Sequence, residues 1–277
     1  MKKLNIIALA LFFAITSSLS AQKIKVENES YKFNDGKKHA LKVNLFTDKH
    51  KDIIKAFLAE ATTEGGTVEE KRKEAVLKNV LIKSVSANPL TVYIAVDNDN
   101  NEEADFYASF EQNGEVFVPK TPEYENAEAL MIKIAKNASL PVVTKALDKA
   151  EKELHKLEDK QKKLEDDNKK LEQDTRKQEG NIKKNEKALE KTNKELKKIL
   201  TEMNSGKGNM DKLSKKKEKL DKTHEKTADK MKKEKKSIDD KKDQIKSNNN
   251  DIDQLKSDIK KQAEIVDELK KKYNAVK

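Results

Sequence analysis

The 277-residue sequence predicts an α+β fold, a small antiparallel sheet with two packing helices, followed by a long antiparallel α-helical hairpin that forms a coiled coil. Two observations predict this arrangement. Up to about residue 137, apolar and polar residues mostly alternate, as they do in half-buried strands. From Leu140 to Lys277, apolar residues recur every seven positions on both sides of one break, Asn204-Ser205-Gly206-Lys207-Gly208-Asn209. A sustained seven-residue repeat is typical of coiled coils.

Residues 1–21 are predicted to be a signal peptide. Lys2 and Lys3 precede an apolar run from Ile6 to Ile15, and a short run of small and polar residues follows it. We expect cleavage after Ala21, which leaves Gln22 at the mature N-terminus. A membrane span needs about 20 apolar residues, so we expect no transmembrane segment after cleavage. The ending Ser-Leu-Ser-Ala-Gln is similar to signal peptides of Bacteroidota, which implies the periplasm or cell surface of a Gram-negative bacterium.

Residues 22–137 are predicted to form the α+β domain. Asn34-Asp35-Gly36 is a strong hairpin turn signal. Asp48 is expected to cap a helix whose apolar residues recur at helical spacing from Ile53 to Ala61. A second helix is expected to begin at Thr121-Pro122-Glu123, because proline is tolerated in a first turn. Strands are expected at 23–33, 40–46, 67–73, 79–85, 90–96, 104–110 and 115–118.

Residues 138–277 are predicted to form the hairpin, with arms at about 140–203 and 210–276 and a turn at about 204–209. Ser139 is expected to cap the first arm. The first arm has as its a and d positions Leu140, Val143, Leu147, Ala150, Leu154, Leu157, Gln161, Leu164, Asn168, Leu171, Thr175, Gln178, Ile182, Asn185, Leu189, Thr192, Leu196, Ile199 and Met203. The second arm has Met210, Leu213, Lys217, Leu220, His224, Thr227, Met231, Glu234, Ile238, Lys241, Ile245, Asn248, Ile252, Leu255, Ile259, Gln262, Val266, Leu269, Tyr273 and Val276.

The polar core positions favour one register. If Leu171 faces Ile238, apolar residues meet apolar ones, and Asn168 meets Lys241. An unmatched buried polar group costs about 1–3 kcal/mol, so this sorting is favourable. The same register gathers the polar layers towards the turn and predicts weaker packing there. Heptads alone do not fix topology, so pairing of each arm with another chain stays an alternative.

Charge is distributed unevenly. Residues 145–277 hold 41 Lys and Arg against 30 Asp and Glu, whereas residues 22–144 hold 17 against 20. Arginine, which makes bidentate contacts to phosphates and bases, occurs only at Arg72 and Arg176. The pattern argues against nucleic-acid binding and predicts at most weak electrostatic contact with an anionic envelope surface.

No catalytic, cofactor-binding or metal-binding residue is predicted. The four histidines, at 39, 50, 155 and 224, have no zinc-site spacing, and the chain has no cysteine. Asp97, Asp99 and Asn101 match the first three ligand positions of a calcium loop, but Glu102 stands where such a loop needs Gly, and Ala108 where it needs Glu. A polar turn between two strands explains the run 97–103 without a metal, and calcium binding there stays an alternative.

The mature chain resembles a type of secreted protein from Bacteroidota in which a small α+β domain precedes a Lys/Glu-rich helical hairpin. The resemblance rests on residues 38–47 (KHALKVNLFT), on the strand Leu90–Asp97 and on the helix that leads into the coil. That type has no assigned activity, and the resemblance therefore implies an architecture only. More distantly, the basic helical arms are similar to those of periplasmic holdase chaperones, which carry the hairpin inside the body domain.

The sequence therefore leads us to expect a non-catalytic, exported structural or interaction protein that meets a protein partner, or itself, through the coiled coil. Two alternatives are a holdase that grips clients between basic arms and a coiled-coil adaptor of a cell-wall enzyme.

Overall fold

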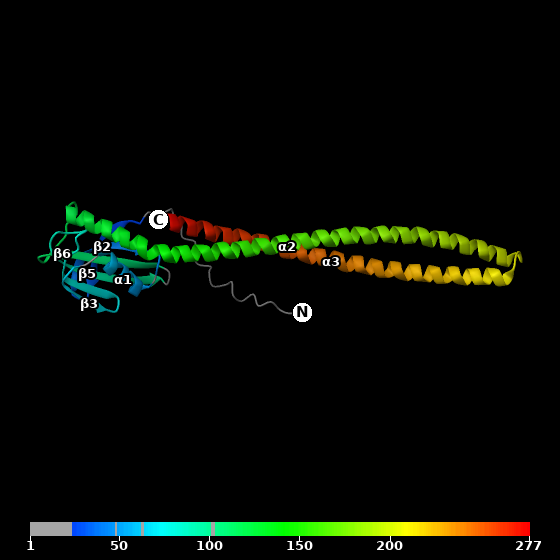
Figure 1. Ribbon diagram of the computed structural model, residues 1–277, viewed down its shortest axis with the longest axis horizontal. Coiled ribbons are helices and arrows are strands. Elements are labelled where there is room, and N and C mark those ends of the chain that lie inside the picture. The colour runs from blue at the N-terminus through cyan, green and yellow to red at the C-terminus, as the bar shows by residue number, and fades with distance from the viewer. Residues whose placement is uncertain (1–23, 48, 62–63, 101–102) are drawn as a thin grey trace. The chain divides into compact units, whose positions relative to one another are not determined.

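The computed structural model describes residues 24–47, 49–61, 64–100 and 103–277 (Figure 1). The chain divides into two compact units. The globular unit comprises the described residues of Met1–Lys152 together with Ala263–Lys277, and the arm unit comprises Glu153–Gln262. Both long helices, α2 (Pro122–Asn204) and α3 (Met210–Val276), contribute to both units. The expected α+β fold with a helical hairpin is confirmed. The proposed signal peptide lies outside the described residues.

Within the described residues, the globular unit contains a seven-stranded antiparallel sheet. The strand order is β1-β2-β6-β5-β4-β3, and β7 pairs with β6. Its strands are β1 (Val26–Phe33), β2 (Gly36–Leu45), β3 (Thr67–Lys71), β4 (Glu74–Val80), β5 (Leu90–Asn100), β6 (Glu103–Gln112) and β7 (Glu115–Val116). Consecutive strands mostly pair with each other, except that β2 pairs with β6, so the first hairpin joins the sheet beside the last long strand.

The first hairpin forms where the turn signal predicted it. Phe33 pairs with Gly36, which leaves Asn34 and Asp35 as a two-residue loop. Gly36 has a φ of 113°, a backbone conformation that residues with a Cβ rarely adopt. The expected helix follows as α1 (His50–Ala61), although its predicted cap, Asp48, lies outside the described residues.

One face of the sheet carries the main core. The helices α1 and α2 both pack against it, with Phe57 from α1 and Met131 from α2 fully buried. The strands supply every second residue, among them Val43, Ile94 and Phe106. This alternation is the pattern that the sequence showed, because a strand with one buried face turns alternate side chains inward.

The expected strand at 79–85 is wrong, since β4 runs from Glu74 to Val80. Asn79 has a φ of 55°, and the pairing of β4 with β5 shifts between Leu77 and Val80. Ile82 and Val85 are buried although they lie beyond the strand, and the Val85 N–H donates to the Ile82 carbonyl in a turn. Their apolar character reflects burial within a loop rather than strand periodicity.

The expected helix cap at Ser139 is also wrong. Thr121 caps α2, since its Oγ1 accepts the Tyr124 N–H at 3.3 Å, and the helix then continues through Ser139 and Pro141. Ser139 is fully buried, and its Oγ accepts the backbone N–H of Phe46 at 3.0 Å. The hydroxyl therefore satisfies the backbone next to β2 instead of starting a helix.

Candidate interaction surfaces

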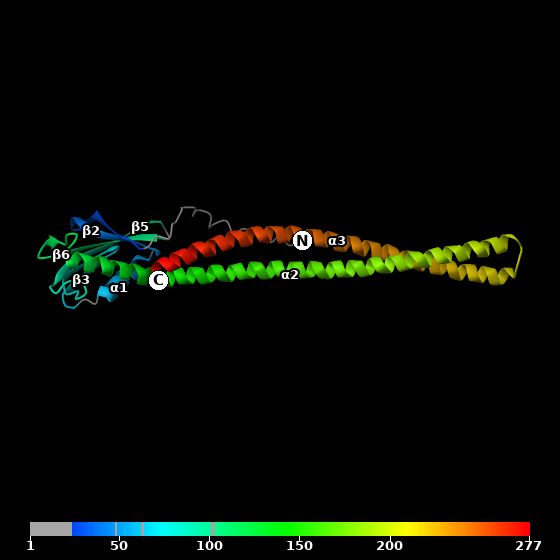
Figure 2. The same cartoon turned by 90° about the horizontal axis from the view of Figure 1, so that it is seen from above.

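The seam of the arm unit follows the predicted heptads. Among the described core positions of both arms, each side chain except that of Met210 is buried or partly buried, whereas most positions between them are exposed. Figures 1 and 2 show α2 and α3 side by side along the arm unit in both views. The two arms thus fill each other's hydrophobic stripe within one chain.

Hydrogen bonds across the seam identify its register. Asn248 Nδ2 donates to Asn168 Oδ1 at 2.8 Å, and Asn168 Nδ2 donates to Asn249 Oδ1 at 2.8 Å. Nearer the turn, Gln178 Nε2 donates to Ser237 Oγ at 3.1 Å. The predicted register, which placed Asn168 opposite Lys241, is therefore wrong by one heptad.

The turn explains this shift. Gly206 has a φ of 67°, its N–H donates to the Met203 carbonyl, and the Lys207 N–H donates to the Glu202 carbonyl. This pair of bonds is a Schellman motif, the usual end of a helix at a glycine. Asn209 then caps α3, because its Oδ1 accepts the Lys212 N–H at 3.1 Å. The chain reverses between Ser205 and Asn209, later than the predicted register required.

The far end of α3 is held within the globular unit. Lys272 Nζ lies 3.1 Å from a Glu103 carboxylate oxygen and 5.2 Å from the centre of the Phe46 ring. Lys136 Nζ donates to the Lys277 carbonyl at 3.4 Å. A register shift of α3 would break these contacts, so they add to the turn in fixing the alignment of the two helices.

An apolar cluster interrupts the polar part of the seam. Ile182, Met231 and Ile238 are buried together, and Leu189 packs against them. The predicted register placed Ile238 opposite Leu171 and Leu189 opposite Leu220, whereas the observed register brings both into the cluster with Ile182 and Met231. The stretch expected to pack weakly towards the turn therefore contains a small apolar core.

The second face of the sheet carries an aromatic and charged cluster that the sequence analysis missed. The Tyr31 and Tyr107 rings stack at 4.1 Å between centroids, and Phe33 lies 5.9 Å from Tyr93. These residues lie on the side of their strands that faces away from the main core, which the alternating pattern suggested would face solvent. The signal that could have found them is the concentration of large aromatic rings on that side of β1, β5 and β6.

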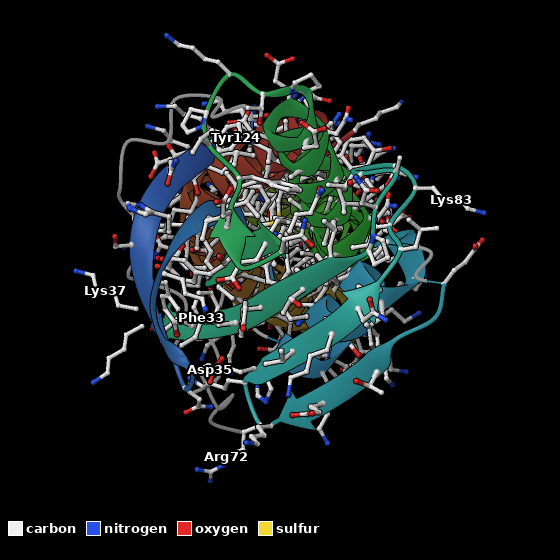
Figure 3. All side chains as sticks on the ribbon, turned by 90° about the vertical axis from the view of Figure 1, so that its left-hand side faces the viewer. Phe33, Asp35, Lys37, Arg72, Lys83 and Tyr124 are labelled. Atoms are coloured by element: carbon white, nitrogen blue, oxygen red, sulfur yellow. The ribbon has the colours of Figure 1, made fainter. Side chains whose placement is uncertain are left out.

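The first hairpin covers this second face. The Asn34 N–H donates to a Glu74 carboxylate oxygen at 2.9 Å, which ties the hairpin loop to β4. Figure 3 shows the loop, marked by Phe33 and Asp35, on the same side of the sheet as the turn that holds Arg72. The sheet therefore curves so strongly that its second face closes into a small core.

Two lysines line the aromatic cluster and are paired with acids. Lys38 Nζ lies 2.7 Å from Glu111 and 4.0 Å from the centre of the Tyr93 ring, and Lys42 Nζ lies 3.0 Å from Asp105. Burial alone would lower the pKa of Lys38, but the hydrogen bond and charge of Glu111 raise it above its ordinary value. Both lysines therefore stay charged.

The tyrosines of this face are held neutral. Burial, with the charges of Asp97 and Glu74 nearby, raises the pKa of Tyr31 to about 12. Burial also raises the pKa values of Tyr93 and Tyr107. One buried polar atom of this face, Ser109 Oγ, has no hydrogen-bond partner among the described residues.

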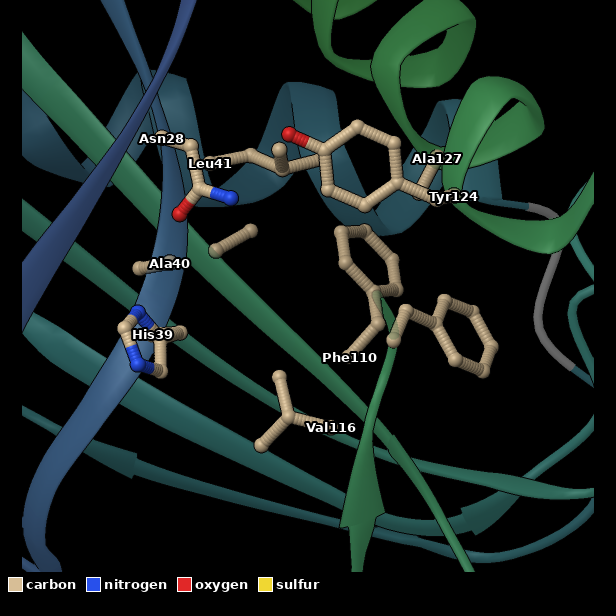
Figure 4. Close-up of a pocket in the computed structure, with 10 residues that line it drawn as sticks. Asn28, His39, Ala40, Leu41, Phe110, Val116, Tyr124 and Ala127 are labelled. Carbon is tan, nitrogen blue, oxygen red and sulfur yellow. The ribbon is translucent and has the colours of Figure 1, made fainter. Parts of the chain in front are cut away.

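A shallow pocket lies near the start of α2, between Asn28, His39, Val116 and Tyr124, with Phe110 at its base (Figure 4). Most of its wall is apolar. His39 is exposed at its rim, and no carboxylate, serine, cysteine or lysine joins it in the lining. Its free volume is about that of one water molecule, so it offers no space for a larger ligand.

The remaining histidines and the acidic run at residues 97–103 lie apart from one another. His50 begins α1, His155 pairs with Glu158 at 3.2 Å, and His224 is partly buried in the seam. The Asp97–Glu103 run lies where β5 meets β6, and the side chains 98–102 are outside the description. Asp97 itself lies 3.9 Å from Lys73 Nζ. Over the described ranges, no three His, Asp or Glu side chains are grouped to hold a metal ion.

Within the described part of the chain, no helix is both long and apolar enough to cross a membrane. Comparisons with known proteins found no matching family, no matching curated relative and no matching solved structure.

Proposed function

We propose that the protein is a non-catalytic, exported interaction protein of the cell envelope, with the arm unit as spacer and partner-binding element. The observation that carries this proposal is the seam of the arm unit. Its core positions are occupied by residues of the same chain, and its polar residues Asn168 and Gln178 have partners across it. The arm is therefore built without a second chain, and its outer surface stays available to a partner.

The globular unit supports the same proposal. Its closely spaced charged pairs, Lys38 with Glu111 and Lys42 with Asp105, hold the strands β2 and β6 together across the second face. Both lysines are partly buried and paired with an acid, so on this proposal the pairs serve to align the strands. We assign this unit a docking or anchoring role.

A holdase that grips clients between its arms would need arms that separate. The seam is closed along the arm unit, and the apolar cluster around Ile182 closes its middle. This geometry favours the spacer over the holdase. Purified protein is therefore expected not to suppress aggregation of an unfolded outer-membrane protein at equimolar ratio, and clear suppression would favour the holdase.

Export and partner binding can be tested in the same cells. Fractionation should place the protein in the periplasm or at the surface, with a mature mass that begins at Gln22. A photo-crosslinking amino acid at the outward arm positions Lys163 and Lys187 should give a discrete adduct, and the same probe at Val68 of β3 serves as the control. A protein retained in the cytoplasm with residues 1–21 attached would refute the proposal. So would adducts at Val68 with none from the arm.

A further inference from the structure

The positive charge of the arm unit is concentrated near its turn. Residues 191–222 hold eleven lysines and five acidic residues, whereas residues 153–190 hold eleven basic and eleven acidic residues. We call residues 191–222 the arm end. Because the rest of the first arm is balanced, a negatively charged partner is attracted to the arm end more strongly than to the stretch before it.

Many lysines of the arm end have no acidic partner. Lys194 pairs with Glu190, Lys217 with Asp221 and Lys222 with Glu218. Across the arm unit, all of which the structure describes, no ion pair involves the exposed residues Lys197, Lys198, Lys207, Lys212, Lys215 and Lys216. Their charges are therefore free to meet external anions.

Two apolar side chains are exposed among these lysines. Leu200 is 42% exposed and Met210 is 48% exposed, and Glu153–Gln262 contains no other large hydrophobic residue that is so exposed. Leu200 lies outside the a and d positions. Met210 is an a position, but α2 has already ended at Asn204, so no helix covers it. The arm end thus combines unpaired positive charges with two uncovered apolar groups.

This combination fits an anionic lipid surface better than a protein surface. Protein interfaces are enriched in aromatic residues and arginine and depleted in lysine, and the arm end contains neither arginine nor an aromatic residue. A lysine close to an anionic bilayer is attracted to the negative potential of its surface. Apolar side chains beside such lysines can enter the boundary between head groups and acyl chains.

We propose that the arm end binds the surface of an anionic lipid bilayer, with its unpaired lysines at the lipid phosphates and Leu200 and Met210 inserted between head groups. The proposal adds a membrane contact at the arm end to the protein contact proposed for the rest of the arm, and it rests on the proposed envelope function. It requires no membrane-spanning segment, because the contact is made at the surface alone.

The test is co-sedimentation of the mature chain with lipid vesicles. Binding is expected to vesicles that contain phosphatidylglycerol, to weaken steeply with added salt, and to be absent with phosphatidylcholine alone. The variant Lys197→Gln, Lys198→Gln, Lys215→Gln, Lys216→Gln should bind at least tenfold more weakly. Circular dichroism should show unchanged helicity, since these residues are exposed and unpaired.

Two further variants make the test specific. The control Lys162→Gln, Lys163→Gln, Lys183→Gln, Lys184→Gln removes the same charge from the balanced part of the arm and should bind within twofold of the parent. The variant Leu200→Ser with Met210→Ser keeps every charge and should bind several-fold more weakly.

Three outcomes would overturn the proposal. They are no binding to phosphatidylglycerol vesicles, whether or not the protein binds an acidic polypeptide, an equal loss in the control variant, and unchanged binding by the Leu200→Ser, Met210→Ser variant. The assay uses purified protein and is independent of export. An exported protein that fails it refutes the membrane contact only, and a cytoplasmic protein that passes it refutes the proposed function only.

Discussion

Asn248 donates a hydrogen bond to Asn168 across the seam of the arm unit at 2.8 Å, and the amide nitrogen of Asn168 donates to the side-chain oxygen of Asn249. The Asn168 side chain is buried, with 8% of its surface exposed. A buried asparagine in a coiled coil restricts the register at some cost in stability, because other alignments leave its amide unpaired. This layer therefore helps to define how the two arms align.

Replacing Asn168 alone should destabilise the protein. Asn168→Leu leaves the Asn248 and Asn249 amides without their partner, at a cost of about 1–3 kcal/mol. The double variant Asn168→Leu, Asn248→Leu removes both sides of the bond and should regain most of that loss. Urea unfolding followed by circular dichroism measures both effects. A double variant no more stable than the single one would show that the layer does not act as a pair.

The register itself can be tested by engineered disulfides, since the chain has no cysteine. A seam that pairs Asn168 with Asn248 places Leu171 opposite Ile245. Leu171→Cys with Ile245→Cys should therefore form an intrachain disulfide on mild oxidation, because bridging needs Cβ atoms about 4 Å apart. Leu171→Cys with Ile238→Cys is the control and should remain reduced or bridge slowly. Faster bridging of the control pair, or disulfide-linked dimers as the main product, would contradict the cis register.

The buried hydroxyl of Ser139 is expected to contribute to stability through one backbone group. Ser139→Ala leaves the Phe46 N–H without its acceptor, which should cost about 1–3 kcal/mol. Thr201→Ala is the matched control, because the Thr201 hydroxyl is exposed and donates only to the Lys197 carbonyl within its own helix. The comparison is made on urea midpoints. Equal effects of the two variants would argue against a tertiary role for Ser139.

The adjacent glycines 65 and 66 should respond differently to alanine. Both have positive φ, 70° and 69°, so both variants carry the backbone cost of about 1 kcal/mol. A Cβ on Gly66 would clash with the Lys78 carbonyl oxygen, whereas one on Gly65 meets nothing within 4 Å. Gly66→Ala should therefore lower the free energy of unfolding by a further 1–3 kcal/mol, roughly, because the backbone must shift to relieve the clash. Thermal unfolding of the two variants provides the test, and equal midpoints would be inconsistent with the close approach.

Alkaline pH should weaken the globular unit through Tyr31. Its folded-state pKa of about 12 lies above the unfolded value of about 10. The contribution of Tyr31 to stability is complete below about pH 10 and is lost as the pH rises through about 12. In that range the tyrosine of the unfolded chain has already lost its proton, whereas Tyr31 in the folded chain still holds it. Tyr31→Phe should make the decline shallower without removing it, since Tyr93 and Tyr107 also have raised pKa values. Urea midpoints across this range provide the measurement, and identical slopes for variant and parent would disprove the role of Tyr31.

Local signals in the sequence were sufficient for much of the fold. The Asn34-Asp35-Gly36 turn and the helix start at Thr121-Pro122-Glu123 depend on a few neighbouring residues, and both formed where expected. The heptad frame was also correct, because burial on a helix repeats with the same period as the sequence. These features need no knowledge of distant contacts.

The errors arose where distant parts of the chain decide the outcome. The register depends on the geometry of the turn and on the contacts of Lys272 with Glu103, which no heptad pattern contains. The Ser139 hydroxyl was assigned to a helix cap because its use by Phe46 is visible only in three dimensions. The aromatic second face was missed because nothing local indicates that the hairpin loop reaches Glu74.

The Schellman turn at Gly206 and the opposed asparagines have a consequence for how the gene can change. In an antiparallel pair fixed at its turn, seven codons added to one arm displace every layer between the insertion and the end of the helix. Only a second insertion at the facing position of the other arm restores the pairing. The length of the arm can therefore change in matched blocks, one in each helix, and a single duplication between Asn168 and the turn would separate Asn168 from Asn248.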